Sequence, residues 1–300
     1  MYGAIIGDIV GSKYEFNNIK TKDFPFISQG CEFTDDTVMT VAVAKAILRS
    51  REENYPFKPI LVQEMQSLGR KFPHAGYGGM FSSWLYEEDP KPYNSFGNGS
   101  AMRVSPCGLI AVSLDEAIAL ARASAEVTHN HPEGIKGAEA TAAAIFLARM
   151  EKNKEAIGGY ICDHYYNLSQ TLDEIRPTYW FNETCQNTVP QAIIAFLEST
   201  SYEDAIKNAI SLGGDSDTLA AITGAIAWSY YRFNDRSGKE THKKEGRIWP
   251  EVCDNIISEY HIDSMLPEDF VNTIELLDIA RMQRAGTYDR TGFCSQIILE

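Results

Sequence analysis

The sequence predicts an all-α protein that forms a single compact multi-helix orthogonal domain over residues 1–300. Three observations lead to this prediction. Apolar residues recur at three- and four-residue spacing along most of the chain, polar start signals and glycine stop signals flank these segments, and alternating runs that would indicate strands are short and few. Since no linker, low-complexity block or internal repeat divides the chain, we expect one domain.

Two helices of the first half are predicted from their capping signals. Residues 37–49 carry apolar side chains at helical spacing, and this helix should start after Thr34 or Asp35. The second helix begins after Ser113, where Glu116 stands three residues on in a capping-box pattern. Each start places a side-chain oxygen beside backbone N–H groups that have no partner within the helix.

The second half is predicted to be helical as well. Residues 133–150 are rich in alanine and apolar on almost every side, which predicts a central, buried helix. Gly213 and Gly214 should end the helix that Ser201 caps. Functional residues are then expected in the loops between helices. Further helices are predicted over residues 218–231 and 267–284.

The composition excludes several classes of protein. A formal net charge of −14 argues against nucleic-acid binding and against a basic membrane-binding face. The six cysteines form no CxxC pair, which is typical of free thiols in a reducing compartment. Gly7 and Asp8 interrupt the N-terminal apolar run, so it does not resemble a signal peptide, and no apolar stretch reaches the ~18 residues of a membrane span. We expect a cytoplasmic monomer with no membrane partner.

Carboxylates concentrate in two short loops, FTDDT at residues 33–37 and GGDSDT at residues 213–218. Each loop precedes an apolar helix and combines aspartates with a threonine hydroxyl. The polar residues of the first loop can converge only at an unwound helix start, whereas Asp215 and Asp217 share a face if their loop is extended. Clustered carboxylates repel one another, and a hard cation such as Mg²⁺ or Mn²⁺, which takes oxygen ligands, would remove that repulsion.

A simpler interpretation treats each loop as an ordinary helix cap, since acidic residues are favoured in the first turn. One such loop alone would be interpreted in this way, but two loops of the same chemistry favour a metal site. Two familiar motifs do not fit the second loop. An EF-hand needs an oxygen ligand and then glycine where the chain has Leu219 and Ala220, and a phosphatase-type DxDx[TV] motif needs Thr or Val at position 219.

Two further segments carry weaker signals. Gly97 and Gly99 flank Asn98 in a loop that can turn backbone N–H groups toward an anion, although a lone GNG is also an ordinary turn. His129 and His131 could bind metal or cap the following helix. Zinc is not expected there, because no cysteine or acidic partner stands at zinc spacing.

Two charged residues have no clear role from their local sequence. Arg103 could pair with a phosphate, but a lone arginine usually belongs to a surface or structural ion pair. Glu15 on its own is typical of a solvated charge. Neither residue would be chosen as functional without further information.

Five stretches together form a known pattern: GAIIGDIVGSKYEF, FTDDTVMT, GNGSAMR, THNHPEGIKGAEA and GGDSDTLAAITGAIA. They lie between residue 3 and about residue 228, in the order found in the ADP-ribosylglycohydrolase family, which the chain resembles. Each stretch alone is weak, whereas five in order are specific. The resemblance implies an all-α fold with a two-metal site at helix N-termini, usually holding two Mg²⁺ or Mn²⁺ ions.

The resemblance also implies roles for individual residues. The metal ligands would be Thr34, Asp35 and Asp36 for one ion and Asp215, Asp217 and Thr218 for the other, with Asp217 bridging. The catalytic carboxylates would be Glu15 and Asp36. The substrate-binding residues would be Phe96, Gly97, Asn98, Gly99, Ser100 and His129.

The activity that the resemblance implies is hydrolysis of the glycosidic bond between ADP-ribose and an acceptor. The partner would be an ADP-ribosylated protein, with arginine as the preferred acceptor, or a small ADP-ribosyl conjugate; serine and a nucleic-acid end stay open as acceptors. Two alternatives also stay open: a non-catalytic ADP-ribose-binding or regulatory protein, and a metal-dependent hydrolase of another nucleotide substrate. The complete set of expected ligand positions favours catalysis.

Overall fold

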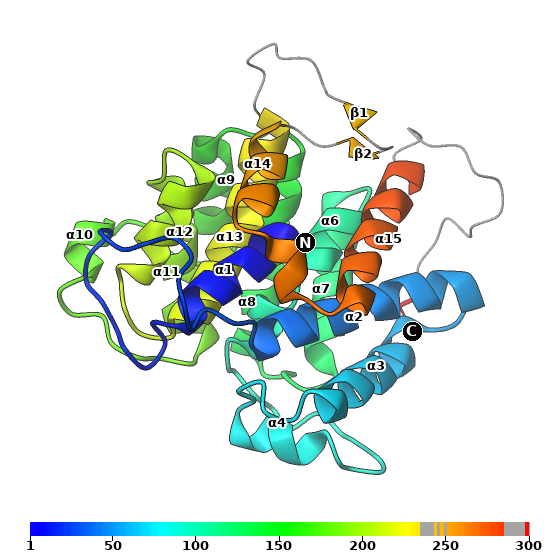
Figure 1. Ribbon diagram of the computed structural model, residues 1–300. Helices are drawn as coiled ribbons and strands as arrows, with labels where there is room; N and C mark the ends of the chain where they lie inside the picture. Colours follow the sequence, from blue (N-terminus) through cyan, green and yellow to red (C-terminus); the bar gives the residue numbers. More distant parts are fainter. Residues whose placement is uncertain (235–242, 245–246, 249–250, 285–297, 300) are drawn as a thin grey trace.

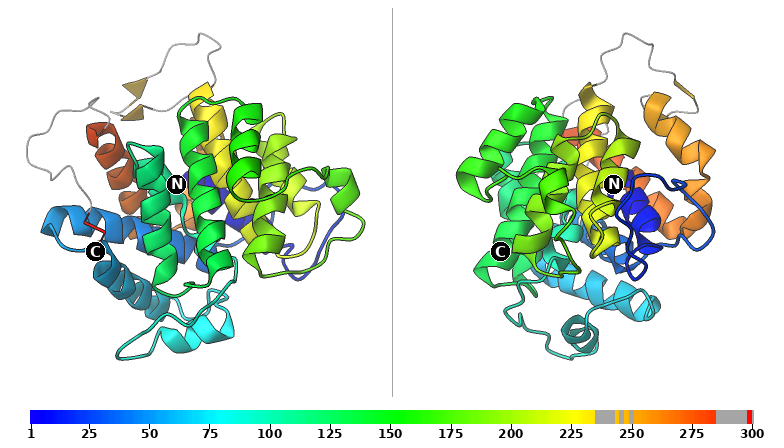
Figure 2. Two further views of the ribbon diagram at one scale, coloured as in Figure 1. Left: turned by 180° about the vertical axis from the view of Figure 1, so that it is seen from behind. Right: turned by 90° about the vertical axis from the view of Figure 1, so that its left-hand side faces the viewer.

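The computed structural model describes residues 1–234, 243–244, 247–248, 251–284 and 298–299. Helices cross one another around a helical centre, with α2 running across the direction of α7 and α8 (Figures 1 and 2). In these ranges the strands are β1 (Lys243–Lys244) and β2 (Arg247–Ile248), which pair antiparallel. The prediction of an all-α fold is confirmed.

The helices follow in chain order. The first half holds α1 (Tyr2–Ser12), α2 (Asp35–Glu53), α3 (Phe57–Lys71), α4 (Gly79–Trp84), α5 (Gly99–Met102), α6 (Ser105–Ile110), α7 (Leu114–Glu126) and α8 (Pro132–Arg149). The second half holds α9 (Lys154–His164), α10 (Leu172–Ile175), α11 (Cys185–Leu197), α12 (Tyr202–Ile210), α13 (Ser216–Asn234), α14 (Glu251–Glu259), the 3₁₀ helix η1 (Ile262–Met265) and α15 (Glu268–Arg284).

The capping signals identify the helix starts correctly. Thr34 caps α2 with its hydroxyl, and Ser113 and Ser201 cap α7 and α12 in the same way. Gly213 and Gly214 follow α12 with φ of 69° and 82°, a left-handed conformation that glycine adopts without strain. The first helix, α1, was not predicted, because its apolar run is interrupted by glycines and by one aspartate.

The helices α1 and α13 lie side by side, far apart in sequence and in close contact in space (Figure 1). Glycines at every fourth position of α1 make this approach possible. A Cβ atom on Gly7 would lie 2.1 Å from the carbonyl oxygen of Ala220, and one on Gly11 would lie 2.5 Å from the Cα atom of Asp217. The end of α1 is therefore held directly against the start of α13.

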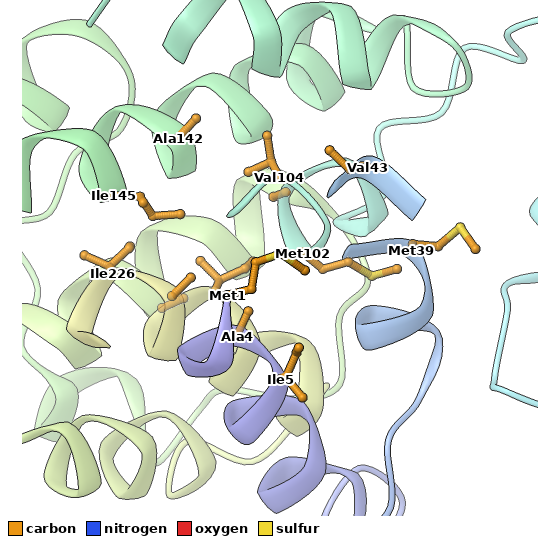
Figure 3. Packing of buried hydrophobic residues seen from close by; sticks show 14 of the residues in the cluster. Met1, Ala4, Ile5, Met39, Val43, Met102, Val104, Ala142, Ile145 and Ile226 are labelled. Atoms are coloured by element: carbon orange, nitrogen blue, oxygen red, sulfur yellow. The ribbon is translucent and has the colours of Figure 1, made fainter. Parts of the chain in front are cut away.

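The core is built around α8 and α13. Helix α8 is buried along most of its length, which confirms the prediction for residues 133–150. Figure 3 shows Ala142 and Ile145 of α8 in one apolar cluster with Ile226 of α13. Full burial of an isoleucine contributes about 1.5–3 kcal/mol. The same cluster extends to Met39 and Met102, which also line the cavity described below (Figure 3).

The structure describes the state of four of the six cysteines and the length and polarity of the helices. Cys31, Cys107, Cys162 and Cys185 are free thiols, as predicted. Cys253 and Cys294 lie outside the part of the chain whose side chains are described. None of the helices in the described residues is both long enough and apolar enough to span a membrane.

Candidate active site

A cavity of about 550 Å³ lies where the first turns of α2 and α13 meet the loops that precede α5 and α11. One part of its wall is acidic and holds Glu15, Asp35, Asp36, Asp215 and Asp217. Another part is the glycine loop, Gly97–Gly99, with Phe96, His129 and Arg103 beside it. Among these described lining residues, Arg103 is the only lysine or arginine.

Three carboxylates of the acidic wall can meet at one point. One oxygen each of Glu15, Asp215 and Asp217 lies within 4.8 Å of the other two. Asp217 belongs to the first turn of α13, and Asp215 directly precedes that helix. The start of α13 therefore brings Asp215 and Asp217 together. The extended loop that was expected to place them on one face is not present.

The first turn of α2 lies against the first turn of α13. Thr34 is the extended N-cap residue, and its hydroxyl accepts a hydrogen bond from Asp36 N at 3.3 Å. Thr218 Oγ1 donates to Asp36 Oδ2 at 3.2 Å, and Thr34 Oγ1 lies 3.4 Å from Asp217 Oδ2. The predicted metal ligands of both loops thus meet where two regular helix starts face each other, and the unwound start that the sequence predicted is not observed. Asp35 lines the cavity beside them, whereas Thr34 is not among the lining residues.

Burial and mutual repulsion raise the pKa of the carboxyl groups here. Burial, followed by the charge of Asp217, raises the pKa of Glu15 to about 8. Burial raises the pKa of Asp215 to about 6. Burial also holds the pKa of three further carboxyl groups well above their ordinary range: Asp35, Asp36 and Asp217.

The same carboxylates have unused ligand capacity. Oδ1 of Asp36 and Oδ1 of Asp217 are buried and accept no hydrogen bond from the described residues. Such atoms are costly to bury unless a proton or a cation compensates them. A set of carboxylate and hydroxyl oxygens without nitrogen or sulfur ligands suits a hard divalent cation such as Mg²⁺ or Mn²⁺. The residues present therefore fit the metal site that the sequence predicts.

Asp8 belongs to this acidic cluster and was missed from the sequence. It is fully buried in the middle of α1. Its carboxylate accepts hydrogen bonds from N and Oγ1 of Thr34 at 2.9 and 2.7 Å, and from N and Oγ1 of Thr37. Asp8 thereby joins α1 to the first turn of α2. The available signal was a single aspartate in an apolar run, within the first of the five family stretches but without a role of its own there.

Hydrogen bonds from two asparagine side chains hold the loops around Glu15 and Asp215 in place. Asn18 donates to Glu15 O at 2.7 Å and accepts from Gly214 N at 2.6 Å. Asn98 Nδ2 donates to Asp215 Oδ2 at 2.7 Å. Asn98, which was predicted to bind substrate, lines the cavity, and its buried side chain is directed to the acidic cluster. Asn18 was not predicted, because its partner lies 196 residues away.

Phe96 stands at the opening of the cavity. Its side chain is 44% exposed, and its ring centroid lies 5.2 Å from that of His131. His131 is the N-cap of α8, and its Nδ1 accepts a hydrogen bond from Glu133 N at 3.1 Å. The capping role considered for His131 is therefore the one that the structure shows.

The glycine loop is backed by buried polar side chains. Ser100, which was expected to bind substrate, has a fully buried hydroxyl that donates to Gly134 O at 2.7 Å, and it is not among the lining residues. His129 is buried and lines the cavity. Gly97 and Gly99 line it as well, and a Cβ atom on Gly99 would lie 3.2 Å from His129 Nε2. The loop therefore offers mainly its backbone to a ligand.

Comparison with known proteins identifies the class to which this protein belongs. A family model described as ADP-ribosylglycohydrolase matches residues 1–235, and the chain belongs to this family. The family is one of glycohydrolases, so the chain falls in an enzyme class. The resemblance inferred from the five sequence stretches is confirmed.

Several named relatives support the same assignment. The chain is 27% identical to ADP-ribosylhydrolase ARH3 of Homo sapiens, over 76% of this chain and 83% of that protein. It is 25% identical to ADP-ribosylarginine hydrolase Tri1 of Serratia proteamaculans (strain 568), over 78% of this chain and 71% of that protein. A solved structure titled ADP-ribosylglycohydrolase-related protein complex matches with a TM-score of 0.61 at 22% identity, covering 79% of this chain and 87% of that one, and shows the shared fold.

Proposed function

We propose that the protein is a dimetal-dependent hydrolase that cleaves the glycosidic bond between ADP-ribose and an acceptor. The observation that carries this proposal is the division of one cavity into two chemistries. The acidic part suits cations and, through them, sugar hydroxyls, whereas the other part presents the N–H of Gly99, the His129 ring and the single arginine of the described lining residues. A diphosphate-linked ribose presents groups that match both parts.

Two divalent cations, Mg²⁺ or Mn²⁺, are the proposed cofactors. When bound, they supply positive charge that holds ribose hydroxyls and lowers the pKa of a water molecule. The two helix starts provide the proposed ligands. These are Thr34, Asp35 and Asp36 on α2, and Asp215, Asp217 and Thr218 at α13. The hydroxyl of Thr34 donates to Asp8 and accepts from Asp36 N, which leaves one lone pair of its oxygen to bind a cation.

Glu15 and Asp36 are the proposed catalytic carboxylates. Glu15 lines the cavity with one carboxylate oxygen within 4.8 Å of Asp215 and Asp217, where its carboxylate can accept the proton of an attacking water. Cleavage of a glycosidic bond develops positive charge at the anomeric carbon, which buried carboxylates such as Asp36 stabilise. The glycine loop, Phe96 and His129 would position the ADP-ribosyl group on the opposite wall.

Arginine is the proposed acceptor, so the proposed substrate is ADP-ribosylarginine. Tri1, a relative, carries that substrate in its name. The cavity opening has a matching chemistry: Glu183 lines it with an exposed side chain, and the rings of Phe16 and Phe181 stack nearby at the surface with centroids 6.2 Å apart. A guanidinium group is flat and cationic, so it can pair with a carboxylate and lie on an aromatic face.

The test is release of free ADP-ribose from arginine-, serine- and DNA-linked substrates. Each reaction runs with Mg²⁺, with Mn²⁺ and with EDTA, and Asp36→Ala runs beside wild type and beside Asp163→Ala, which changes an exposed aspartate on α9. We expect metal-dependent release from the arginine linkage, a loss on the order of 100-fold in Asp36→Ala, and no loss in Asp163→Ala. Undiminished turnover in EDTA or in Asp36→Ala would contradict the dimetal mechanism. Binding of ADP-ribose without release from any substrate would favour a non-catalytic role.

A further inference from the structure

Three polar side chains form a chain of contacts behind the glycine loop. Arg103 Nη2 donates to Ser124 O at 2.7 Å and to Thr128 Oγ1 at 2.9 Å. Thr128 Oγ1 in turn lies 2.7 Å from His129 Nδ1. Arg103, Thr128 and His129 are all buried, with exposed fractions of 1%, 0% and 5%. In such a site the positions of the protons are fixed by which groups can accept them.

The hydroxyl of Thr128 decides which nitrogen of His129 carries the proton. A guanidinium group only donates, so Thr128 Oγ1 accepts from Arg103 and has one proton left to give. Among the described contacts of Thr128 Oγ1, His129 Nδ1 is the remaining acceptor. If Nδ1 carried the proton instead, the threonine proton would be buried without a partner. Nδ1 is therefore the acceptor, and the proton of the neutral ring is on Nε2.

Nε2 faces the glycine loop. A Cβ atom on Gly99 would lie 3.2 Å from Nε2, and one on Gly97 would lie 3.4 Å from it. Both glycines line the cavity, as His129 does. Gly97 N donates to Ser95 Oγ and Asn98 N donates to Glu183 O. The N–H of Nε2 is thus placed beside that of Gly99 as a second donor to an anion.

The surroundings disfavour a second proton on His129. Burial, and then the charge of Arg103, lower the pKa of His129 well below its ordinary value. Tyr93, whose ring centroid lies 6.0 Å from that of His129, and Cys185, which contacts the glycine loop, are neutral near pH 7 because burial raises the pKa of each to about 12. Other ionisable side chains at this loop are those of Glu183, which is exposed, and of Asp215, whose carboxylate accepts a hydrogen bond from Asn98. Glu133 of α8 lies near enough to act on Cys185 through its charge.

We propose that Arg103 and Thr128 are positioning residues that hold His129 as a neutral Nε2–H donor to a diphosphate oxygen of ADP-ribose. The choice of ADP-ribose rests on the proposed function, whereas the tautomer rests on the contacts alone. A donor that stays neutral binds equally well above and below the usual histidine pKa. The glycine-loop contribution to ADP-ribose affinity is therefore the same at pH 6 and at pH 8.

The tautomer is tested first in the full-length protein without ligand. Nitrogen NMR of ¹⁵N-histidine-labelled protein, with His129 assigned by comparison with His129→Gln, reports the state of each ring nitrogen. We expect an unprotonated Nδ1 and a protonated Nε2 at both pH 6 and pH 8. A protonated Nδ1, alone or in an imidazolium ring at pH 6, overturns the proposal whatever the protein binds.

The positioning role is tested with Thr128→Val, which keeps the shape and removes the hydroxyl, and Thr128→Ser, which restores it. Binding of ADP-ribose is measured by calorimetry in the presence of Mg²⁺ at pH 6 and pH 8. We expect the Kd to rise about fivefold to tenfold in Thr128→Val, since one hydrogen bond to a charged group is lost, and to stay within about twofold in Thr128→Ser. Equal affinities of wild type and Thr128→Val for ADP-ribose would overturn the positioning role of Thr128. Failure of wild type to bind ADP-ribose would overturn the proposed function and the ligand assignment, while the NMR result would still decide the tautomer.

Discussion

The acidic cluster and the glycine loop line the same cavity but are held together in different ways. In the acidic cluster like charges from α1, α2 and α13 are pressed together, and oxygens of Asp36 and Asp217 accept no hydrogen bond from the described residues. Behind the glycine loop Ser100 is paired with Gly134 and Arg103 with Thr128, although Arg103 Nε and Ser124 Oγ have no partner among the described residues. The acidic part needs cations or protons to compensate its charge, whereas the glycine loop is held by hydrogen bonds that need no ligand.

The largest effect should come from removing one charge of the acidic cluster. Asp217→Asn keeps the size of the side chain and removes a negative charge that raises the pKa of Glu15 and of Asp36. We expect turnover to fall on the order of 100-fold or more, because a metal ligand is lost. We expect the metal-free protein to become more stable, since a repulsive buried charge is gone.

Both effects are measured on the same sample, by ADP-ribose release with Mg²⁺ and by thermal unfolding in EDTA. Asp163→Asn, on the exposed face of α9, is the matched control and should change neither. A variant that loses activity and also loses stability in EDTA would show that Asp217 is structural, and the contrast between the two parts of the cavity would fail.

The second effect tests the contact that brings the acidic residues together. A Cβ atom on Gly7 would lie 2.1 Å from a backbone oxygen of α13, which is too close for any side-chain rearrangement to relieve. We expect Gly7→Ala to lower the free energy of unfolding by about 2–3 kcal/mol and to weaken Mg²⁺ binding. Gly159→Ala, in α9 with no atom within 4 Å of the new Cβ, should instead stabilise by about 0.5–1 kcal/mol.

These measurements use urea unfolding and titration of Mg²⁺ by calorimetry. If Gly7→Ala folds with unchanged stability and unchanged Mg²⁺ affinity, the close approach of α1 to α13 is not needed for the cluster. A loss of stability with unchanged Mg²⁺ affinity would limit the role of this contact to the core.

The comparison also shows which parts of the site were predictable. The two acidic loops were recognised because helix caps are local signals, and Thr34 and Ser113 start helices as their spacing predicts. Asp8 and Asn18 were missed because their roles depend on contacts with residues that are distant in sequence, up to 196 residues away for Asn18. The direction of the Ser100 hydroxyl was also beyond the sequence, since it is set by packing against the start of α8.

The fold class followed from apolar periodicity, helix start and stop signals and the scarcity of strand patterns, but these signals did not identify one of the helices. The residues of α1 were interpreted as an interrupted apolar run, because glycine is a poor helix former and Asp8 breaks the pattern. In the structure each of those irregularities has a tertiary reason: the glycines admit α13, and Asp8 accepts hydrogen bonds from α2. Residues that weaken a local prediction here are the ones that build the site.

The third effect is a pH dependence confined to the metal-free protein. Folding raises the pKa of Asp8 and Asp215 from 3.8 to about 6 and that of Glu15 from 4.5 to about 8. The folded state therefore binds more protons than the unfolded state, and stability falls as pH rises from about 4 to about 8. We expect the Tm in EDTA to drop by several degrees between pH 4 and pH 8.

Added Mg²⁺ should flatten this profile, because bound cations replace the protons. Differential scanning calorimetry at fixed ionic strength, with and without Mg²⁺, makes the comparison. A Tm in EDTA that rises between pH 4 and pH 8 would contradict the burial of like charges.

The smallest expected effect distinguishes recognition of the acceptor from recognition of the ADP-ribosyl group. Glu183 is exposed at the cavity opening, where a pairing with a guanidinium group is screened by solvent and contributes about 1 kcal/mol at most. We expect Glu183→Gln to lower kcat/KM for the arginine-linked substrate by about fivefold and to leave binding of free ADP-ribose unchanged, because the latter lacks the acceptor. Glu155→Gln, an exposed glutamate on α9, should change neither quantity. An equal loss of kcat/KM on arginine- and serine-linked substrates would mean that Glu183 acts on the shared ADP-ribosyl group, and arginine recognition would then have to come from the Phe16 and Phe181 rings alone.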